Sequence, residues 1–348
     1  MRIRSFLIEV AVKKRESFTL SQVSGRELRE RVKKIWNEGI PEGEPLESLS
    51  AVDGSRNKKT YAGYVIYAVG ACSLTFKGGS LYRESYLAEI DLLKPEEYSD
   101  SRLRILMGIV EAKEALKSLE SSQAVMIDGS IVGDFLRPVV FNFEISERGK
   151  RWVFERFKSL KENFTLKQID SKRYYREIEE NFPGREFPVV AGFLEYLEYL
   201  YCYYRLVEEG KGKIIAVSKR SNSWNHKLDP ILPDIAVLNI ADPPPGHSEP
   251  FRLSLKEKKF AFPGEFEELL SDREFTTFYF RLGAGIYKCE TDMEPQKALK
   301  VLSYYQVRGY PYPLKEVHRR VKITREDIEE IVRILRHRGV TGREALGE

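Results

Sequence analysis

Two Asp-Gly-Ser motifs are the first candidates for chemistry in this sequence, at Asp53-Gly54-Ser55 and Asp128-Gly129-Ser130. Each follows a short apolar stretch that is typical of a buried strand, residues 49–52 and residues 124–127. A carboxylate at a strand end is held rigidly at the rim of a sheet, and the glycine after it lets backbone or ligand approach closely. A single Asp-Gly is common turn chemistry, but two copies after two predicted strands indicate a site for a hard divalent cation.

A third carboxylate is expected from the helix between the two motifs, predicted over residues 100–120. Glu111 has Met107 one turn before it and Ala115 one turn after it, so it shares the apolar side that packs on the sheet. Glu114 is followed by polar residues and is interpreted as solvated. A carboxylate on a packed face is costly unless it is paired or metal-bound. Glu111 is therefore the favoured third ligand, with a structural salt bridge as the alternative.

One histidine is placed to join these carboxylates. His318 lies in the helix predicted over residues 314–323, on the same side as Leu314, Val317 and Val321. A histidine on an apolar face is more often a core residue, but three carboxylates need a further ligand or proton carrier, and imidazole serves as either. The other histidines lie in polar or loop stretches and offer less.

A site formed by all these candidates would combine Asp53, Glu111, Asp128 and His318. Oxygen ligands with one nitrogen suit manganese or magnesium and suit structural zinc poorly. Two such ions can activate a water and stabilise the leaving oxygen of a phosphodiester, so phosphodiester hydrolysis is the resulting hypothesis. Lys219 follows the strand predicted over residues 214–217 and could neutralise charge on the scissile phosphate, although an ordinary surface lysine explains it nearly as well.

Basic and aromatic residues alternate just before the predicted His318 helix, around Tyr310. Arginines can follow phosphates while aromatic rings stack on unpaired bases, so this segment indicates contact with nucleic acid. The candidate DNA contacts are Arg56, Arg220, Arg308 and Tyr312. A similar mixture at residues 172–176 is interpreted as a solvated helix face.

The order of the predicted elements favours an α/β fold. Strands at residues 62–76 and 81–92 form an antiparallel hairpin around Gly78-Gly79, after the strand that ends at Asp53. The order strand, strand, strand, helix, strand, helix, strand matches the ribonuclease-H-like fold, in which the fourth strand lies beside the first. Asp53 and Asp128 would then meet in a mixed sheet flanked by helices.

Other elements surround this core. A helix over residues 16–38, whose second half Ser24 can cap, belongs to an N-terminal helical extension of residues 1–45. Residues 46–348 are then one domain, with helical or loop insertions at about 140–210 and 240–275. Further helices are predicted at 150–162, 193–209, 314–323 and 325–338, and a second hairpin at 276–282 and 286–290. The last helix has a capping box at Thr324 and Asp327, and Gly339 is expected to end it.

Composition excludes several classes of protein. In 348 residues, 57 Lys and Arg oppose 53 Asp and Glu, a net charge of +4 that does not by itself identify a nucleic-acid binder. Cys72, Cys202 and Cys289 are widely spaced, which argues against a disulfide framework or thiolate zinc site and fits a reducing cytoplasm. No signal peptide or membrane span is expected. Scarce amides with abundant Glu, Lys and Arg are a weak indication of a thermophile.

The motifs together resemble the NurA nucleases of archaea and some bacteria. The resemblance rests on Ala51-Val52-Asp53-Gly54-Ser55, Met126-Ile127-Asp128-Gly129-Ser130, Val217-Ser218-Lys219, and Gly309-Tyr310-Pro311-Tyr312-Pro313-Leu314 followed by His318. It implies a core close to that of Argonaute PIWI domains. It also implies a manganese-dependent nuclease, acting on single-stranded DNA and from 5′ ends on duplex DNA, as a homodimeric ring that docks on the hexameric ATPase HerA in DNA end resection.

The resemblance also implies roles for particular residues. Asp53, Glu111, Asp128 and His318 fall where the family has its metal-site residues, and Tyr310 falls on its active-site tyrosine. Lys219 matches more loosely.

Two other functions remain open on the residues alone. Actin-like phosphotransferases also begin with a strand that ends in Asp and a small-residue turn, but this chain shows no second three-strand unit and no adenosine loop. A non-catalytic DNA clamp or adaptor for a partner ATPase could keep the same fold, although it would not need inward carboxylates. Nucleotide-dependent phosphate release without DNA would favour the phosphotransferase, and undiminished activity of the assembly after Asp53→Ala would support the adaptor.

Overall fold

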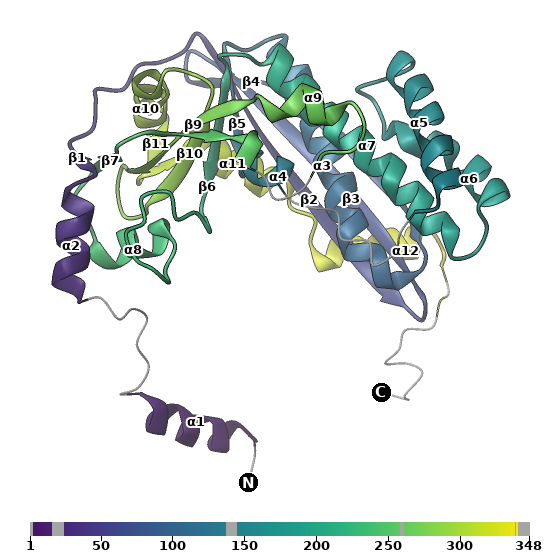
Figure 1. Ribbon diagram of the computed structural model, residues 1–348, viewed down its shortest axis with the longest axis horizontal. Helices are drawn as coiled ribbons and strands as arrows, with labels where there is room; N and C mark the ends of the chain where they lie inside the picture. Colours follow the sequence, from purple (N-terminus) through teal and green to yellow (C-terminus); the bar gives the residue numbers. More distant parts are fainter. Residues whose placement is uncertain (1–2, 16–23, 137–144, 258–260, 338, 340–348) are drawn as a thin grey trace.

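The computed structural model describes residues 3–15, 24–136, 145–257, 261–337 and 339. In these ranges ten strands form one sheet, in the order β1-β7-β9-β10-β6-β5-β2-β3-β4, with β8 paired to β9 (Figure 1). The strands are β1 Trp36–Glu38, β2 Ser48–Tyr61, β3 Tyr64–Lys77, β4 Ser80–Leu93, β5 Ala124–Asp128, β6 Ile214–Ser218, β7 Gly246–Ser248, β8 Phe251–Ser254, β9 Glu274–Arg281 and β10 Tyr287–Thr291.

Strands β2, β3 and β4 form the antiparallel meander that the sequence predicts. The turn between β3 and β4 is Gly78-Gly79, and both glycines have the positive φ that a two-residue hairpin turn requires. One prediction here is wrong: β2 does not end at Asp53 but continues to Tyr61. The polar residues after Gly54 are typical of a loop, yet β3 pairs with β2 along its whole length and keeps it extended.

The fourth and fifth strands of the core run parallel to the first. β5 pairs with β2, with Val52 opposite Ile127, and β6 pairs with β5, with Asp128 opposite Val217. The predicted ribonuclease-H-like order of a mixed sheet flanked by helices is therefore confirmed. Beyond β6 the sheet continues through the predicted hairpin of β9 and β10, and then through β7 and β1.

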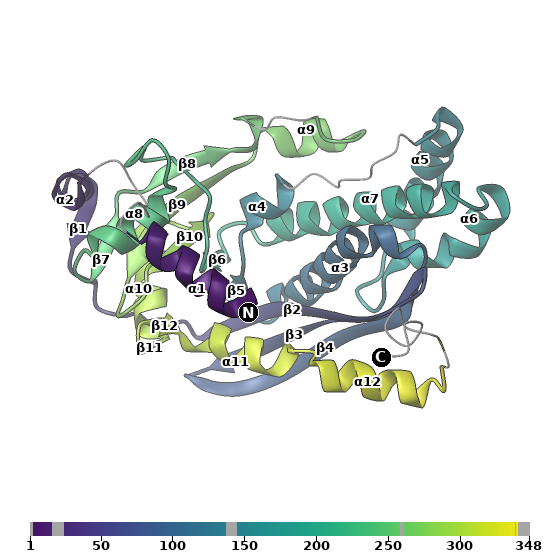
Figure 2. The ribbon, with the colours of Figure 1, turned by 90° about the horizontal axis from the view of Figure 1, so that it is seen from below.

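Helices cover both faces of β2 to β5. Figure 2 shows α3 (Ser99–Leu119) and α7 (Glu186–Glu209) on one side, and α11 (Tyr312–Val321) and α12 (Arg325–Ile334) on the other. Side chains of β2 and β5 alternate between these two cores, so Val52 and Ile127 face α3 while Ala51 and Met126 face α11. Burial on both faces is what makes these strand segments continuously apolar.

The other elements lie around this core. The remaining described helices are α1 Ile3–Lys14, α2 Gly25–Lys33, α4 Ile131–Phe135, α5 Glu147–Glu162, α6 Tyr175–Asn181, α8 Asp234–Ala241, α9 Phe266–Ser271 and α10 Pro295–Tyr304. Short 3₁₀ turns occur at η1 Glu96–Tyr98, η2 Asp170–Tyr174 and η3 Leu255–Glu257, and a small hairpin pairs β11 Gln306–Val307 with β12 Tyr310–Pro311. None of the described helices is both long and apolar enough to cross a membrane.

Some predicted boundaries are wrong. In place of a helix over 16–38, α2 starts after Ser24, whose Oγ accepts the Glu27 N–H as predicted, and residues 36–38 are strand β1. Residues 16–23 lie outside the described residues. α12 has the predicted capping box at Thr324 but ends at Ile334, because the chain turns at Arg336 with φ 51°. The division into an extension of residues 1–45 and a domain of 46–348 stays a prediction.

The basic and aromatic segment 172–176 is not the solvated face that was predicted. Lys172 forms ion pairs with Glu89 and Asp91 of β4, and the Tyr175 hydroxyl hydrogen-bonds the buried carboxylate of Glu195 in α7. Only Arg176 points outward with most of its side chain exposed. The segment therefore ties η2 and α6 to the body of the protein.

A buried ion-pair cluster joins α3 to α7 and η2. The Lys113 ammonium lies 2.8 Å from Asp170 Oδ2 and 2.7 Å from Glu198 Oε1, and all three side chains are inaccessible to solvent. Glu198 also accepts the backbone N–H groups of Asp170 and Ser171. Burial alone pushes the pKa of Asp170 upward, but the attraction of Lys113 holds it below its usual value.

We expect Lys113→Met to lower the free energy of unfolding at pH 7 by about 3–5 kcal/mol, because two buried carboxylates lose their cation. The low pKa of Asp170 stabilises the wild type above about pH 4, and this stabilisation is lost as the pH falls. The difference between variant and wild type should therefore shrink below pH 4. Urea unfolding at several pH values checks this, and a difference independent of pH would contradict it.

Candidate metal centre

The register of two parallel strands brings the aspartates of the two motifs together. Val52 lies opposite Ile127, so the next residues, Asp53 and Asp128, are neighbours. Both belong to the face that carries Ala51, Met126 and α11. Asp128 is the last residue of β5, as predicted, whereas Asp53 lies within β2.

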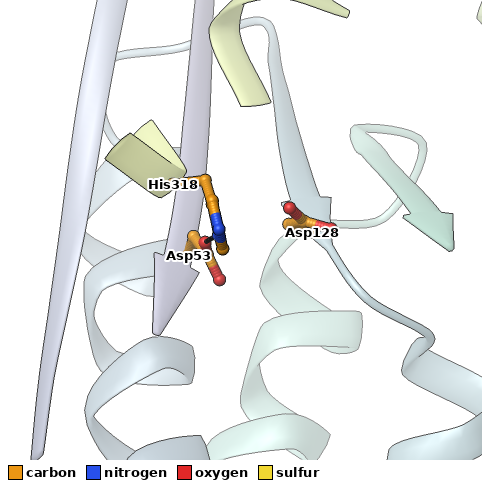
Figure 3. Close-up of side chains that lie close together, drawn as sticks. All are labelled: Asp53, Asp128 and His318. Atoms are coloured by element: carbon orange, nitrogen blue, oxygen red, sulfur yellow. Dashed lines mark hydrogen bonds and ion pairs between the residues drawn. The ribbon is translucent and has the colours of Figure 1, made fainter. Parts of the chain in front are cut away.

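His318 completes a group of three. One ligand atom from each of Asp53, Asp128 and His318 lies within 4.8 Å of the other two. Figure 3 shows these three side chains together. An ion with ligands at about 2.0–2.6 Å has donor atoms up to about 4–5 Å apart, so this spacing fits a single divalent cation. In the described part of the chain no other group of three such residues is close enough to do so.

The histidine reaches the site from the edge of its helix. Leu314, Val317 and Val321 of α11 are buried as predicted, but the His318 side chain is 58% exposed, so its placement on the inward side was wrong. Its Nδ1 lies 2.7 Å from Asp53 Oδ2. With Nδ1 donating this hydrogen bond, Nε2 keeps the lone pair that a metal needs.

Two carboxyl groups at the site, those of Asp53 and Glu111, have raised pKa values. Burial, followed by repulsion from Asp128, raises the pKa of Asp53 to about 6, although the hydrogen bond with His318 lowers it. Burial and the charge of Asp53 raise the pKa of Glu111 well above its usual value. A divalent cation would relieve both effects, because it favours the ionised carboxylates. The donor set therefore fits manganese or magnesium.

Glu111 approaches this group from α3, on the other face of the sheet. Its side chain is buried, and Gly54 makes room for it: a Cβ at Gly54 would lie 3.3 Å from Glu111 Oε2 and 3.1 Å from Met107 Cγ. Glu111 is not one of the three residues that lie within 4.8 Å. Glu114, predicted to be solvated, is instead fully buried and bonded to Ser73 and Lys117.

The two motif glycines therefore differ in their surroundings. A Cβ at Gly54 would crowd Met107 and Glu111, whereas a Cβ at Gly129 would meet nothing within 4 Å. We expect Gly54→Ala to lower the free energy of unfolding by about 1–3 kcal/mol through overpacking. Gly129→Ala, the matched control, should change it by less than about 0.5 kcal/mol. Urea denaturation measures both, and equal effects would show that Gly54 does not accommodate Glu111.

Lys219 and Tyr310 line the open side of the group. The Lys219 ammonium donates to Asp128 Oδ2 at 2.6 Å and lies 5.1 Å from the centre of the Tyr310 ring. The Tyr310 hydroxyl is buried and forms no hydrogen bond among the described residues. Burial, followed by the charges of Asp128 and Asp53, raises the pKa of Tyr310. Tyr310 therefore keeps its proton and can donate it to an incoming group.

A family model, the NurA domain, matches residues 47–323, a range that contains every residue of this site. This chain belongs to the NurA family. The DNA double-strand break repair nucleases NurA of Sulfurisphaera tokodaii and Saccharolobus solfataricus are 26% and 24% identical to it, covering 91% and 92% of this chain and 89% and 91% of theirs.

Crystal structures of NurA proteins share the fold of this NurA-family chain. The NurA nuclease from Sulfolobus solfataricus has a TM-score of 0.73 at 21% identity, over 96% of both chains. A NurA crystal structure bound to dAMP and manganese has a TM-score of 0.67 at 17% identity, over 97% of this chain and 96% of that one.

The predicted DNA contacts of this NurA-family chain lie in different surroundings. Arg220 and Arg308 are exposed, and Arg308 occupies the two-residue turn of the β11–β12 hairpin with φ 56°. Tyr312 is 43% exposed and meets Phe76 edge to face. Arg56 is less open, because its guanidinium donates to the Asp100 carbonyl at 2.7 Å.

Sequence reasoning missed two buried charged residues of β10. Glu290 is bonded to the segment after Asp128, and Lys288 is paired with Glu290. Sequence reasoning also missed Asp134 of α4, whose charge acts on Glu111. The sequence could have indicated Lys288 and Glu290. Two charged residues at alternate positions of a buried strand are unexpected unless both are paired.

Proposed function

We propose that this chain is a metal-dependent DNA nuclease of double-strand break repair, with manganese as its cofactor. The observation that carries the proposal is the convergence of Asp53, Asp128 and His318 within 4.8 Å in a NurA-family chain. Its relatives are named double-strand break repair nucleases, and related crystal structures contain manganese, one of them together with dAMP.

Asp53, Asp128 and His318 would hold the cation, which when bound supplies Lewis-acid chemistry toward a phosphodiester. Lys219 lies against Asp128 on the open side, where its ammonium can neutralise a phosphate oxygen. The Tyr310 hydroxyl, which lacks a partner among the described residues, can donate to the same phosphate. The rings of Tyr310 and Tyr287 lie 5.0 Å apart, and the Tyr310 ring lies beside the Lys219 ammonium.

A second ion is part of the proposal. Glu111 lies outside the group of three, but its carboxylate is buried, and the charges of Asp53, Asp134 and Asp128 repel its ionised form. A further acid beside a complete ligand set is the arrangement that a two-ion site needs. Manganese is the expected ion and magnesium is a possible replacement, because both take carboxylate oxygens.

The finer activity that we propose follows from the family resemblance. It comprises endonuclease and exonuclease cleavage of single-stranded DNA and 5′-to-3′ digestion of duplex ends. The exposed side chains of Arg220, Arg308 and Tyr312 support contact with a single strand, because arginine pairs with phosphate and tyrosine stacks on a base.

Two partners belong to the same proposal, a HerA-type hexameric ATPase and a second copy of this chain. The resemblance to the family supports the first. The second is also supported by β4, the last strand of the sheet, whose outer edge is unpaired among the described strands and whose exposed side chains include Tyr82, Tyr86 and Ile90.

We expect Asp53→Asn and Asp128→Asn each to reduce DNA cleavage in manganese by about 10²–10⁴-fold or more, because each loses a charged metal ligand. Cleavage of end-labelled DNA with and without manganese measures the loss, and circular dichroism checks the fold. Asp242→Asn is the matched control, since Asp242 is an exposed partner of Arg281. Wild-type cleavage by either site variant in manganese would show that the assignment of that aspartate is wrong.

Tyr310→Phe tests the role of the hydroxyl alone. The ring keeps its contacts with Tyr287 and Lys219, and removal of a buried hydroxyl without a partner should not lower stability. We expect cleavage to fall about tenfold while manganese affinity stays within about twofold, because only a bond to substrate is lost. Titration calorimetry with manganese and single-turnover cleavage separate the two quantities. Equal losses in both would make Tyr310 a part of the metal site itself.

A further inference from the structure

A buried carboxylate of β10 is bonded to the chain segment that follows Asp128. Glu290 is fully buried, and its Oε1 accepts the Ser130 hydroxyl at 2.7 Å while its Oε2 accepts the Val132 N–H at 3.0 Å. The Lys288 ammonium, also buried, lies 2.7 Å from Oε1. Both oxygens of Glu290 are therefore used, and two of the three bonds go to the segment after Asp128.

The same segment is held from a second strand. The Gly129 N–H donates to the Val217 carbonyl at 3.0 Å, and the Ser218 hydroxyl donates to the Gly129 carbonyl at 2.7 Å. Ser130 Oγ in turn accepts the Gly133 N–H at 2.8 Å and so caps α4. The segment after Asp128 thus has hydrogen-bond partners on β6 and on β10. Because β6 lies between β10 and β5, the Glu290 side chain reaches this segment across β6.

Glu290 is not one of the three residues that meet at the candidate metal centre. In the sheet register Asp128 is level with Val217 and Cys289, and side chains of Val217 and Cys289 belong to the core on the α11 face. Glu290 follows Cys289 and so points to the opposite face. The bonds that link Glu290 to the segment after Asp128 are those of the Ser130 hydroxyl and the Val132 N–H.

A contribution to net stability is a poor explanation for the buried Lys288–Glu290 pair. A buried ion pair contributes little net stability, because the desolvation of both charges offsets their attraction. Fixing a ligand is a known use of such groups, since residues that hold a metal ligand in place commonly change metal affinity 10–100-fold when mutated. The bonds of Glu290 go to Ser130, two residues after a predicted ligand, and to Val132 in the first turn of α4.

We infer that the Lys288–Glu290 pair is a positioning device for Asp128. It holds the Asp128-Gly129-Ser130 turn so that the Asp128 carboxylate stays beside Asp53 and His318 despite the repulsion between the two aspartates. The inference rests on the proposed metal site. Glu290 is a positioning residue and not a ligand.

Glu290→Gln tests this inference. Glutamine keeps the shape and one acceptor oxygen. Its amide nitrogen cannot accept from the donor that it faces, and the neutral side chain no longer forms an ion pair with Lys288. We expect the dissociation constant for Mn²⁺, measured by titration calorimetry without DNA, to rise about tenfold or more. Hydrogen exchange of the segment 130–133 should be faster than in the wild type before any metal is added. An unchanged Mn²⁺ affinity in a folded variant overturns the inference.

Glu195→Gln is the matched control. Glu195 is equally buried, and its bonds go to Arg102 and Tyr175. The Glu195→Gln substitution should lower the melting temperature. It should leave both the Mn²⁺ affinity and the hydrogen exchange of residues 130–133 unchanged. An equal loss of Mn²⁺ affinity in Glu195→Gln would overturn the inference, because general destabilisation would then explain the effect.

Ser130→Ala provides a second variant if Glu290→Gln does not fold. It removes the hydroxyl that donates to Glu290 and leaves the Lys288–Glu290 pair in place. A loss of Mn²⁺ affinity of about tenfold supports the inference, and wild-type affinity contradicts it. Failure of the wild-type protein to bind Mn²⁺ would instead refute the proposed function, so the two failures are distinguishable.

Discussion

Repulsion between two neighbouring carboxylates is the constraint on which this structure depends. Asp53 and Asp128 sit side by side because β2 and β5 are parallel and in register, and the buried apolar residues before them hold that register from both faces. Burial and repulsion together raise the pKa of Asp53 to about 6. Placing the two ionised carboxylates side by side is therefore electrostatically unfavourable. Packing over the whole sheet provides the free energy that keeps them in place.

The groups around the two acids each reduce part of this repulsion. Lys219 pairs with Asp128, and His318 hydrogen-bonds Asp53 from a helix 265 residues further along the chain. Glu111, for which Gly54 leaves space, does not reduce it: burial and the nearby acids raise the pKa of Glu111 well above its usual value. A divalent cation would favour the ionised form of these carboxylates.

Rigid support extends well beyond the centre. α3 carries Glu111, and the buried pairs of Lys113 and Arg102 bind that helix to α7 at two positions. The Lys288–Glu290 pair supports the turn after Asp128 in the same way. The pairs of Lys113 and Arg102 join elements that are distant in sequence, and so do the bonds of Glu290 to Ser130 and Val132. Charge inside this protein therefore serves the relative placement of its elements more than its net stability.

The sequence by itself determined the residues of the centre and the core order of elements, because hydrophobic periodicity, glycine turns and Asp-Gly-Ser motifs are local signals. Only the tertiary structure decided that β2 runs on through Asp53, that residues 36–38 are a strand, and that His318 reaches the site from an exposed position. It also decided the partners of Glu290 and Lys113. These features depend on pairing between distant strands and helices, and neither residue type nor spacing along the chain encodes which distant group will be the partner.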